Sequence, residues 1–268
     1  MSFLVSSEEY FDYAHKLESL YDDIRHQSCF SNLDNLFIQR KYTKSCQRDY
    51  IRALGVGYVD PSYWRRGMQE LGLEDKRGDF QLAGRFLIPV RDVTGNMLTM
   101  IGWSPRGTKY MTCHTRYFKK AISFFGMDFA LKASQSYGGC AVVVEGMFDC
   151  ISLQSLGLPA LATMGSAVGQ VKCVQLSALF NKVVGLPDGD KVGQDSLPKG
   201  KSPWVLPSNA TFLSLNLKGV KDADDLVTFC DADAVRRCLT MCMSSTKQVE
   251  YLHTKPVRAE TLYPWFSS

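Results

Sequence analysis

The chain has 268 residues, of which 45% are hydrophobic and 22% charged, and its formal net charge is +4. These values are typical of a globular protein with one large domain or two to three smaller ones. A net charge of +4 is too small to predict nucleic-acid binding by itself. No apolar run approaches the roughly 18 residues of a membrane-spanning helix, so we expect no membrane partner.

Cysteine usage predicts a reducing compartment. The chain has nine cysteines, and no two are spaced as Cys-x-x-Cys. Several lie in apolar runs, as Cys150 does before Ile151. This pattern is typical of reduced, buried thiols, so we expect a cytoplasmic protein.

The chain opens with predicted helices. Residues 7–25 form an amphipathic pattern with Ser7 as a candidate N-cap, and residues 33–54 form a second helical region that breaks near Tyr42. The apolar positions expected on the first helix are Tyr10, Phe11, Ala14, Leu17, Leu20 and Tyr21.

A basic, strand-forming segment follows. Strands are predicted at residues 85–91 and 97–103, joined by a turn at Gly95. Residues 85–120 contain seven basic residues and one acidic residue, interleaved with aromatic side chains. Basic groups bind phosphates and flat rings stack on unpaired bases, so the segment indicates nucleic-acid or nucleotide binding. The alternative is a solvated charged face.

The last part of the chain alternates short apolar strands with helices. The predicted strands are residues 140–144, 158–162, 182–186 and 211–215. Strands that are apolar on both faces are typical of a parallel sheet covered by helices. We therefore expect an α/β fold, a doubly wound parallel-sheet unit preceded by a mixed α+β basic subdomain.

Carboxylates follow three of these strands. They are Glu145 and Asp149, then Asp188 and Asp190, then Asp222 and Asp224 with Asp225 beside them. In parallel sheets the chemistry collects beyond the carboxyl ends of the strands, and a rim of carboxylates without bound cations is strongly repulsive. Oxygen ligands suit Mg²⁺ or Mn²⁺ rather than zinc. Taken singly, Asp-Gly-Asp is a common loop, and Asp149 or Asp222 could simply stabilise a helix N-terminus.

The order of these motifs resembles the Toprim pattern of DnaG-type bacterial primases. The resemblance rests on Glu145-Gly-Met-Phe-Asp149, Met164-Gly-Ser166, Asp188-Gly-Asp190-Lys-Val-Gly193-Gln-Asp195 and Lys221-Asp222-Ala-Asp224-Asp225. Upstream, Gly55-Val-Gly57-Tyr58, Trp64, Gly84-Arg85-Phe-Leu-Ile-Pro89, Gly102-Trp-Ser-Pro-Arg106, Lys109-Tyr110, Phe118-Lys-Lys120 and Phe124-Phe-Gly126 resemble the first half of the same polymerase core. Ile122 stands where that family often has a basic residue.

The resemblance implies a domain plan. It predicts a basic α+β subdomain at residues 1–130, a Toprim metal-binding subdomain at residues 138–235 and a short helical tail at residues 236–268. The zinc-binding and helicase-binding domains of the family are not recognisable, so we expect no zinc. Such a short core would suit a phage or mobile element, with the host cytoplasm as its location.

The resemblance also implies a reaction, which is synthesis of RNA primers on single-stranded DNA from ribonucleoside triphosphates, with two or more Mg²⁺ or Mn²⁺ ions. The expected metal ligands are Glu145, Asp188, Asp190, Asp222 and Asp224. The expected catalytic residues are Glu145, Asp149, Asp188 and Asp190. The positions expected to bind nucleotide or nucleic acid are Arg85, Arg106, Lys109, Lys119 and Lys120.

The sequence leaves the partners and two alternative functions open. A replicative helicase or a separate template-recognition protein is a possible partner in this scheme. The alternative functions are a Toprim-type nuclease and a non-catalytic accessory protein that binds single-stranded DNA. The intact acids argue against lost turnover, and the basic segment argues against the nuclease.

Overall fold

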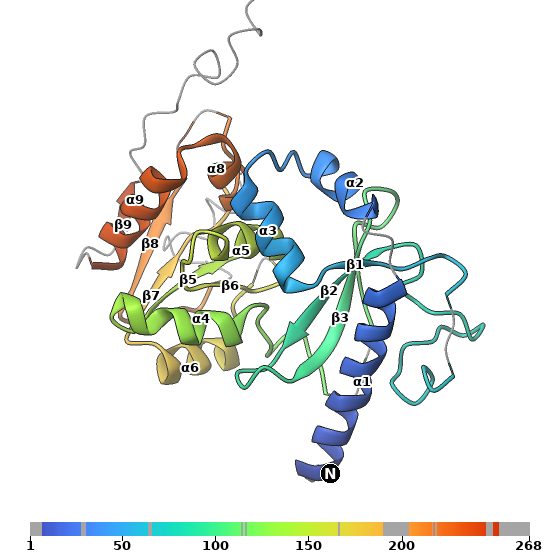
Figure 1. Cartoon of the computed structure of the whole chain (residues 1–268). Helices are drawn as coiled ribbons and strands as arrows, with labels where there is room; N and C mark the ends of the chain where they lie inside the picture. Colours follow the sequence, from blue (N-terminus) through green and yellow to red (C-terminus); the bar gives the residue numbers. More distant parts are fainter. Residues whose placement is uncertain are drawn as a thin grey trace, which may run out of the picture. The chain divides into compact units, whose positions relative to one another are not determined.

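The computed structural model describes residues 7–27, 31–63, 66–113, 115, 117–165, 167–189, 204–215, 217, 219–244 and 249–251. Of the positions named above, Trp64, Ser166, Asp190, Gly193 and Asp195 lie outside these ranges, as does Arg116 of the basic segment. The chain divides into two compact units, Met1–Lys119 and Lys120–Ser268 (Figure 1). The first unit thus ends at Lys119, whereas the basic subdomain was expected to reach residue 130.

The first unit combines three helices with an antiparallel sheet. The helices are α1 (Ser7–Gln27), α2 (Ser31–Gln39) and α3 (Ser45–Leu54). The strands are β1 (Gly57–Tyr58), β2 (Phe86–Arg91), β3 (Met97–Trp103) and β4 (Tyr110–Thr112), hydrogen-bonded in that order. The predicted helices, the break near Tyr42 and the β2–β3 hairpin are confirmed.

The core of this unit lies between α1 and the sheet. Leu17, Leu20 and Ile24 recur at three- and four-residue spacing and pack with Leu87 of β2 and Met100 of β3. Burying each such side chain stabilises the fold by about 1.5–3 kcal/mol. The predicted apolar face was wrong at one position, because Phe11 is 55% exposed.

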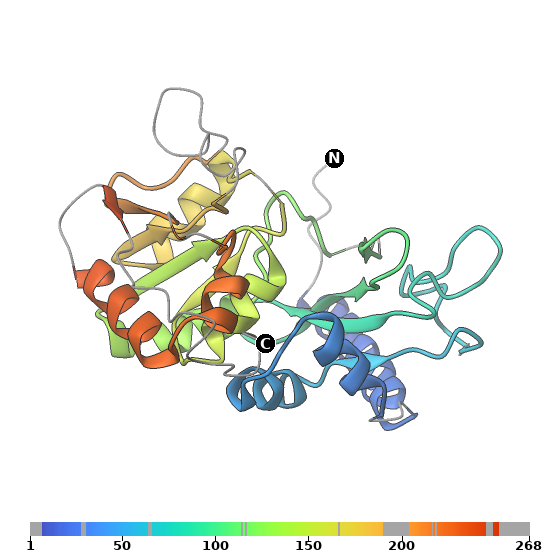
Figure 2. The same ribbon diagram turned by 90° about the horizontal axis from the view of Figure 1, so that it is seen from above.

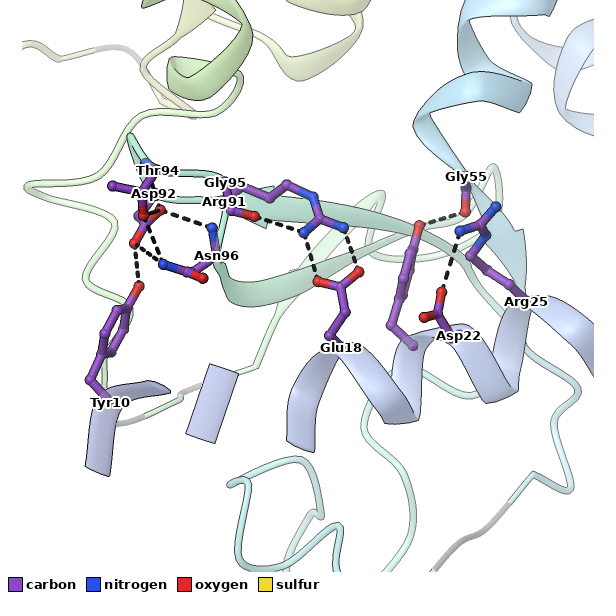
Figure 3. Close-up of polar contacts among 11 residues, drawn as sticks. Tyr10, Glu18, Asp22, Arg25, Gly55, Arg91, Asp92, Thr94, Gly95 and Asn96 are labelled. Carbon is purple, nitrogen blue, oxygen red and sulfur yellow. Dashed lines mark hydrogen bonds and ion pairs between the residues drawn. The ribbon is translucent and has the colours of Figure 1, made fainter. Parts of the chain in front are cut away.

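Polar contacts fasten α1 to the β2–β3 hairpin. Arg91 donates from Nη1 and Nη2 to the two carboxylate oxygens of Glu18, at 2.6 and 2.7 Å, and from Nη1 to the Gly95 carbonyl (Figure 3). The Tyr10 hydroxyl donates to Asp92 at 2.5 Å. Asp92 also accepts backbone N–H groups from Thr94 and Asn96, which closes the predicted turn.

The second unit contains a five-stranded sheet of parallel strands in the order β6-β5-β7-β8-β9. The strands are β5 (Cys140–Val144), β6 (Ala160–Ala162), β7 (Lys182–Gly185), β8 (Ala210–Ser214) and β9 (Val249–Tyr251). The helices are α4 (Met127–Ser134), the 3₁₀ turn η1 (Gln135–Tyr137), α5 (Met147–Gln154), α6 (Gln170–Leu179), α8 (Ala223–Phe229) and α9 (Ala232–Ser244). The predicted parallel α/β unit is confirmed, and β9 is a strand that the sequence analysis did not expect.

Helices cover both faces of this sheet. On one face, Ala141 and Val143 of β5 pack with Ala130 of α4 and Leu176 of α6. On the other, the Cys140 thiol lies 3.5 Å from the Met243 carbonyl of α9. Figure 2 shows α6 (yellow) and α9 (red) on opposite sides of the strands. Burial on both faces explains why β5 is apolar throughout.

No helix among the described residues is long and apolar enough to cross a bilayer.

Candidate metal and nucleotide site

Acidic segments follow three strands that are neighbours in the sheet. Glu145 directly follows β5, and Asp188 comes shortly after β7. After β8, Asp222 directly precedes α8 and Asp224 lies in its first turn. Because β5, β7 and β8 are parallel and adjacent, their carboxyl ends meet at one edge of the second unit. Asp190 lies outside the described residues.

Asp149 lies at the centre of the described acids. It is in the first turn of α5 and is only 7% exposed. Its Oδ1 accepts the backbone N–H of Asp224 at 2.9 Å, and its Oδ2 accepts that of Gly146 at 3.1 Å. A Cβ at position 146 would overlap Oδ2, so a side chain there would displace the Asp149 carboxylate.

Two further carboxylates begin α8. Asp222 is its N-cap, and its Oδ1 accepts the backbone N–H of Asp225 at 2.7 Å. The helix-capping alternative is therefore realised for Asp222, which leaves its Oδ2 outside that bond. Asp224 is 5% exposed, and the Ser152 hydroxyl donates to its Oδ1 at 2.5 Å. The sequence analysis missed Ser152, although it lies three residues after Asp149 and so on the same side of α5.

The segment around Asp188 packs tightly against the approach to α8. Gly189 donates its N–H to the Lys221 carbonyl at 2.5 Å. A Cβ at Gly189 would lie 3.1 Å from the Leu215 carbonyl oxygen and 3.3 Å from that of Lys221, so a side chain fits poorly. The glycine of Asp-Gly-Asp thus lets the β7 loop approach the segment that carries Asp222.

The acidic residues of the cluster influence one another electrostatically. Burial raises the pKa of Asp149 well above its ordinary value, and the nearby carboxylates of Asp222, Asp188 and Asp224 raise it further. Burial also raises the pKa of Asp222, against the N–H donated by Asp225. A cation among these groups would relieve the repulsion.

The donor set fits a hard divalent cation such as Mg²⁺, because all its donors are carboxylate oxygens. Within the described ranges, no three acidic, histidine or cysteine side chains already lie in a metal-binding arrangement. The carboxylates of Asp149 and Asp224 instead accept hydrogen bonds from the chain itself. Each carboxylate keeps further lone pairs for a cation.

The predicted basic residues divide into two groups. Arg106, Lys109 and Lys119 are exposed in the first unit, and the first two lie in the turn between β3 and β4. Arg85 lies against Gly102, where a Cβ would come within 2.7 Å of its Cδ, and it donates to the Thr108 carbonyl at 2.7 Å. Arg91 is bound by Glu18 as described above. Of the basic residues that the structure describes in this segment, Arg85 and Arg91 thus make structural contacts.

The second unit contains a further pair of cations. Lys120 is exposed and lies next to Gly165. The sequence analysis missed Lys172, a buried lysine in the first turn of α6. Its only sequence signal is its place four residues before the core residue Leu176, where an apolar side chain is expected.

Comparisons with known proteins agree with this geometry. Residues 142–227 match a family model described as Toprim-like. The chain is 28% identical over 193 residues to a DNA primase of Clostridium acetobutylicum, with 64% of this chain and 32% of the relative covered. It is 32% identical over 153 residues to a DNA primase of Synechococcus elongatus, covering 53% of this chain and 22% of the relative. The chain thus spans about a third or less of the length of these curated relatives.

Solved structures share the fold. The RNA polymerase domain of Mycobacterium tuberculosis primase DnaG superposes with a TM-score of 0.68 at 21% identity, covering 87% of this chain and 82% of that chain. A DnaG primase catalytic domain bound to single-stranded DNA gives 0.65 at 19% identity, covering 90% and 82%. The likeness extends over both units.

Proposed function

We propose that this chain, which has the fold of the DnaG-type primase catalytic core and contains a Toprim-like region, synthesises RNA primers on single-stranded DNA. The observation that supports this most directly is the carboxylate cluster around Asp149, at the carboxyl ends of adjacent parallel strands. Similarity to DNA primases supports nucleotidyl transfer over other Toprim reactions.

Each acidic residue has a proposed role in the reaction. Asp188, Asp190, Asp222 and Asp224 would hold Mg²⁺ or Mn²⁺, and Glu145 would either hold an ion or accept the proton of the attacking hydroxyl. Bound divalent ions would lower the pKa of that hydroxyl and stabilise charge on the pyrophosphate that leaves. Asp149 fixes the start of α8 through the Asp224 N–H, and so acts on the position of the ligands.

The proposed substrates are a single-stranded DNA template and ribonucleoside triphosphates. A structural neighbour was solved with single-stranded DNA, which supports the first. In the first unit, Arg106 and Lys109 are exposed beside Tyr110, whose side chain is 42% exposed. Cations next to an accessible ring suit an unpaired strand, because they contact phosphate and base together. Arg85, Lys119 and Lys120 complete the proposed basic set.

The test is incubation of the chain with single-stranded DNA, labelled ribonucleotides and Mg²⁺ or Mn²⁺. Short labelled RNA is the expected product. A nuclease would instead shorten the DNA, and a binding protein would leave both unchanged. Addition of a replicative helicase or of a template-recognition protein would test whether either is a partner.

A further inference from the structure

Lys172 is a lysine inside the second unit that no part of the proposed reaction uses. It is 2% exposed, and its Nζ donates to the Thr163 carbonyl at 2.7 Å. The same atom lies 5.0 Å from the centroid of the Phe124 ring. A buried ammonium is costly unless it is paired, and a carbonyl with a ring face compensates only in part.

The turn that accepts this hydrogen bond is joined to the carboxyl end of β5. Thr163 donates its N–H to the Val144 carbonyl at 2.9 Å, one residue before Glu145. Met164 has a φ of +60°, an uncommon conformation for a residue with a side chain. The Lys172 bond therefore helps to hold a strained turn beside the acidic edge of the sheet.

The Lys120 side chain lies against the same turn. A Cβ at Gly165 would be 3.4 Å from its Cε and 3.5 Å from its Nζ, so the ammonium lies within ordinary contact distance of this position. Burial and then Lys120 lower the pKa of Lys172 to about 8. The first turn of α6 contains no acidic residue, and a helix N-terminus is itself positive. Two ammonium groups thus approach the turn at Thr163–Gly165.

We propose that Lys172 is a positioning residue which, acting through Lys120 and the Thr163–Gly165 turn, completes a subsite for a phosphate group. An anion beside Lys120 would be attracted by both ammonium groups, and the partly buried setting lets Lys172 act without touching it. Assigning this phosphate to the triphosphate of a ribonucleotide rests on the proposed function.

The test uses inorganic triphosphate and the full chain in EDTA, so that divalent ions do not contribute to binding. Lys120→Met is expected to raise the dissociation constant about tenfold, the effect of one charged hydrogen bond. Lys172→Gln is expected to raise it by a smaller factor, because the Lys172 charge attracts the anion without contacting it. Gln removes the charge and keeps an N–H donor, although on a side chain that is one atom shorter. Lys132→Met, at an exposed lysine of α4, is the matched control and should bind as the wild type does.

A double-mutant cycle separates positioning from simple stability. If Lys172 acts through Lys120, Lys172→Gln should weaken triphosphate binding far less in the Lys120→Met background. A purely structural lysine would lower the melting temperature and leave binding by the folded protein unchanged. Wild-type affinity in Lys172→Gln would overturn the proposal.

A measurement on the wild type covers the case in which the variant does not fold. Triphosphate in EDTA should slow acetylation of Lys120, followed by mass spectrometry, with Lys132 as the internal reference. Equal acetylation with and without triphosphate would overturn the proposal. Failure of the wild type to make RNA with Mg²⁺ would refute the proposed function instead, and would leave this binding test standing.

Discussion

The backbone N–H of Asp224 donates a hydrogen bond to Oδ1 of Asp149 across 2.9 Å, joining two residues 75 positions apart. The bond connects the first turn of α5 to the first turn of α8, and the Ser152 hydroxyl makes a second link to Asp224. Two acidic segments are therefore held together by the chain itself, although their charges repel. A divalent cation bound among these carboxylates would offset that repulsion.

Divalent ions should stabilise the protein. At about 100 times the dissociation constant, Mg²⁺ or Mn²⁺ is expected to add about 2.7 kcal/mol to the free energy of unfolding, because it binds only the folded cluster. Thermal unfolding with Mg²⁺ and with EDTA measures the effect. Asp188→Asn should reduce it, and Asp233→Asn, on the exposed side of α9, should not. Equal melting temperatures of the wild type in both buffers would contradict the metal assignment.

Arg106→Ala and Lys109→Ala should weaken binding to single-stranded DNA. Each lost phosphate contact is expected to lower the slope of log affinity against log salt by about 0.7. Fluorescence anisotropy at several salt concentrations measures both quantities. Lys76→Ala, at another exposed lysine of the first unit, is the control. If both variants keep the wild-type slope, this face is merely solvated.

The Arg91–Glu18 pair should stabilise the first unit. Its two side chains are only 25% and 32% exposed and meet in a bidentate contact, so a double-mutant cycle with alanine is expected to give about 1 kcal/mol of coupling. The Lys16–Asp12 pair on the same helix is exposed to solvent and should give a smaller coupling energy. Urea unfolding measures both cycles, and equal coupling energies would show that the bidentate contact adds nothing.

Lys172 should make stability depend on pH in the alkaline range. Its pKa is about 8 in the folded protein against 10.5 ordinarily, so the unfolded chain binds more protons between these values. The stability of the wild type relative to Lys172→Met should therefore rise from pH 8 to pH 10.5, by at most about 3 kcal/mol. Below pH 8 the difference should be constant. Urea unfolding of both proteins across this pH range measures the difference in stability. A difference that falls as the pH rises would show that burial does not disfavour the charged form of Lys172.

Much of the fold was predictable from the sequence because its signals are local. β5 and β7 are short apolar runs bounded by turns, and the turn from Asp92 to Asn96 is closed by the side chain of Asp92 itself. The acids could be assigned to one edge of the sheet because parallel strands place their carboxyl ends together.

The remaining features depend on contacts between distant residues. Phe11 fits the helical period of α1, but the sheet packs against Tyr13 and Ile24 instead, and only the tertiary structure fixes that rotation. Ser152 contacts Asp224 across 72 positions, and Lys172 is buried by Phe124 and the Thr163 turn. The helical spacing of Ser152 and Lys172 indicates only which side of its helix each occupies, and the partner of each depends on the tertiary structure.

The most direct test compares the wild type with Asp188→Asn on single-stranded DNA, with labelled ribonucleotides and Mg²⁺. We predict that the wild type makes short, alkali-sensitive RNA complementary to the template. Asp188→Asn, with an unchanged circular dichroism spectrum, should make at least about 100-fold less, because it loses charge stabilisation at the reacting phosphate. Cleavage of the DNA without RNA synthesis, or wild-type synthesis by Asp188→Asn, would contradict this prediction.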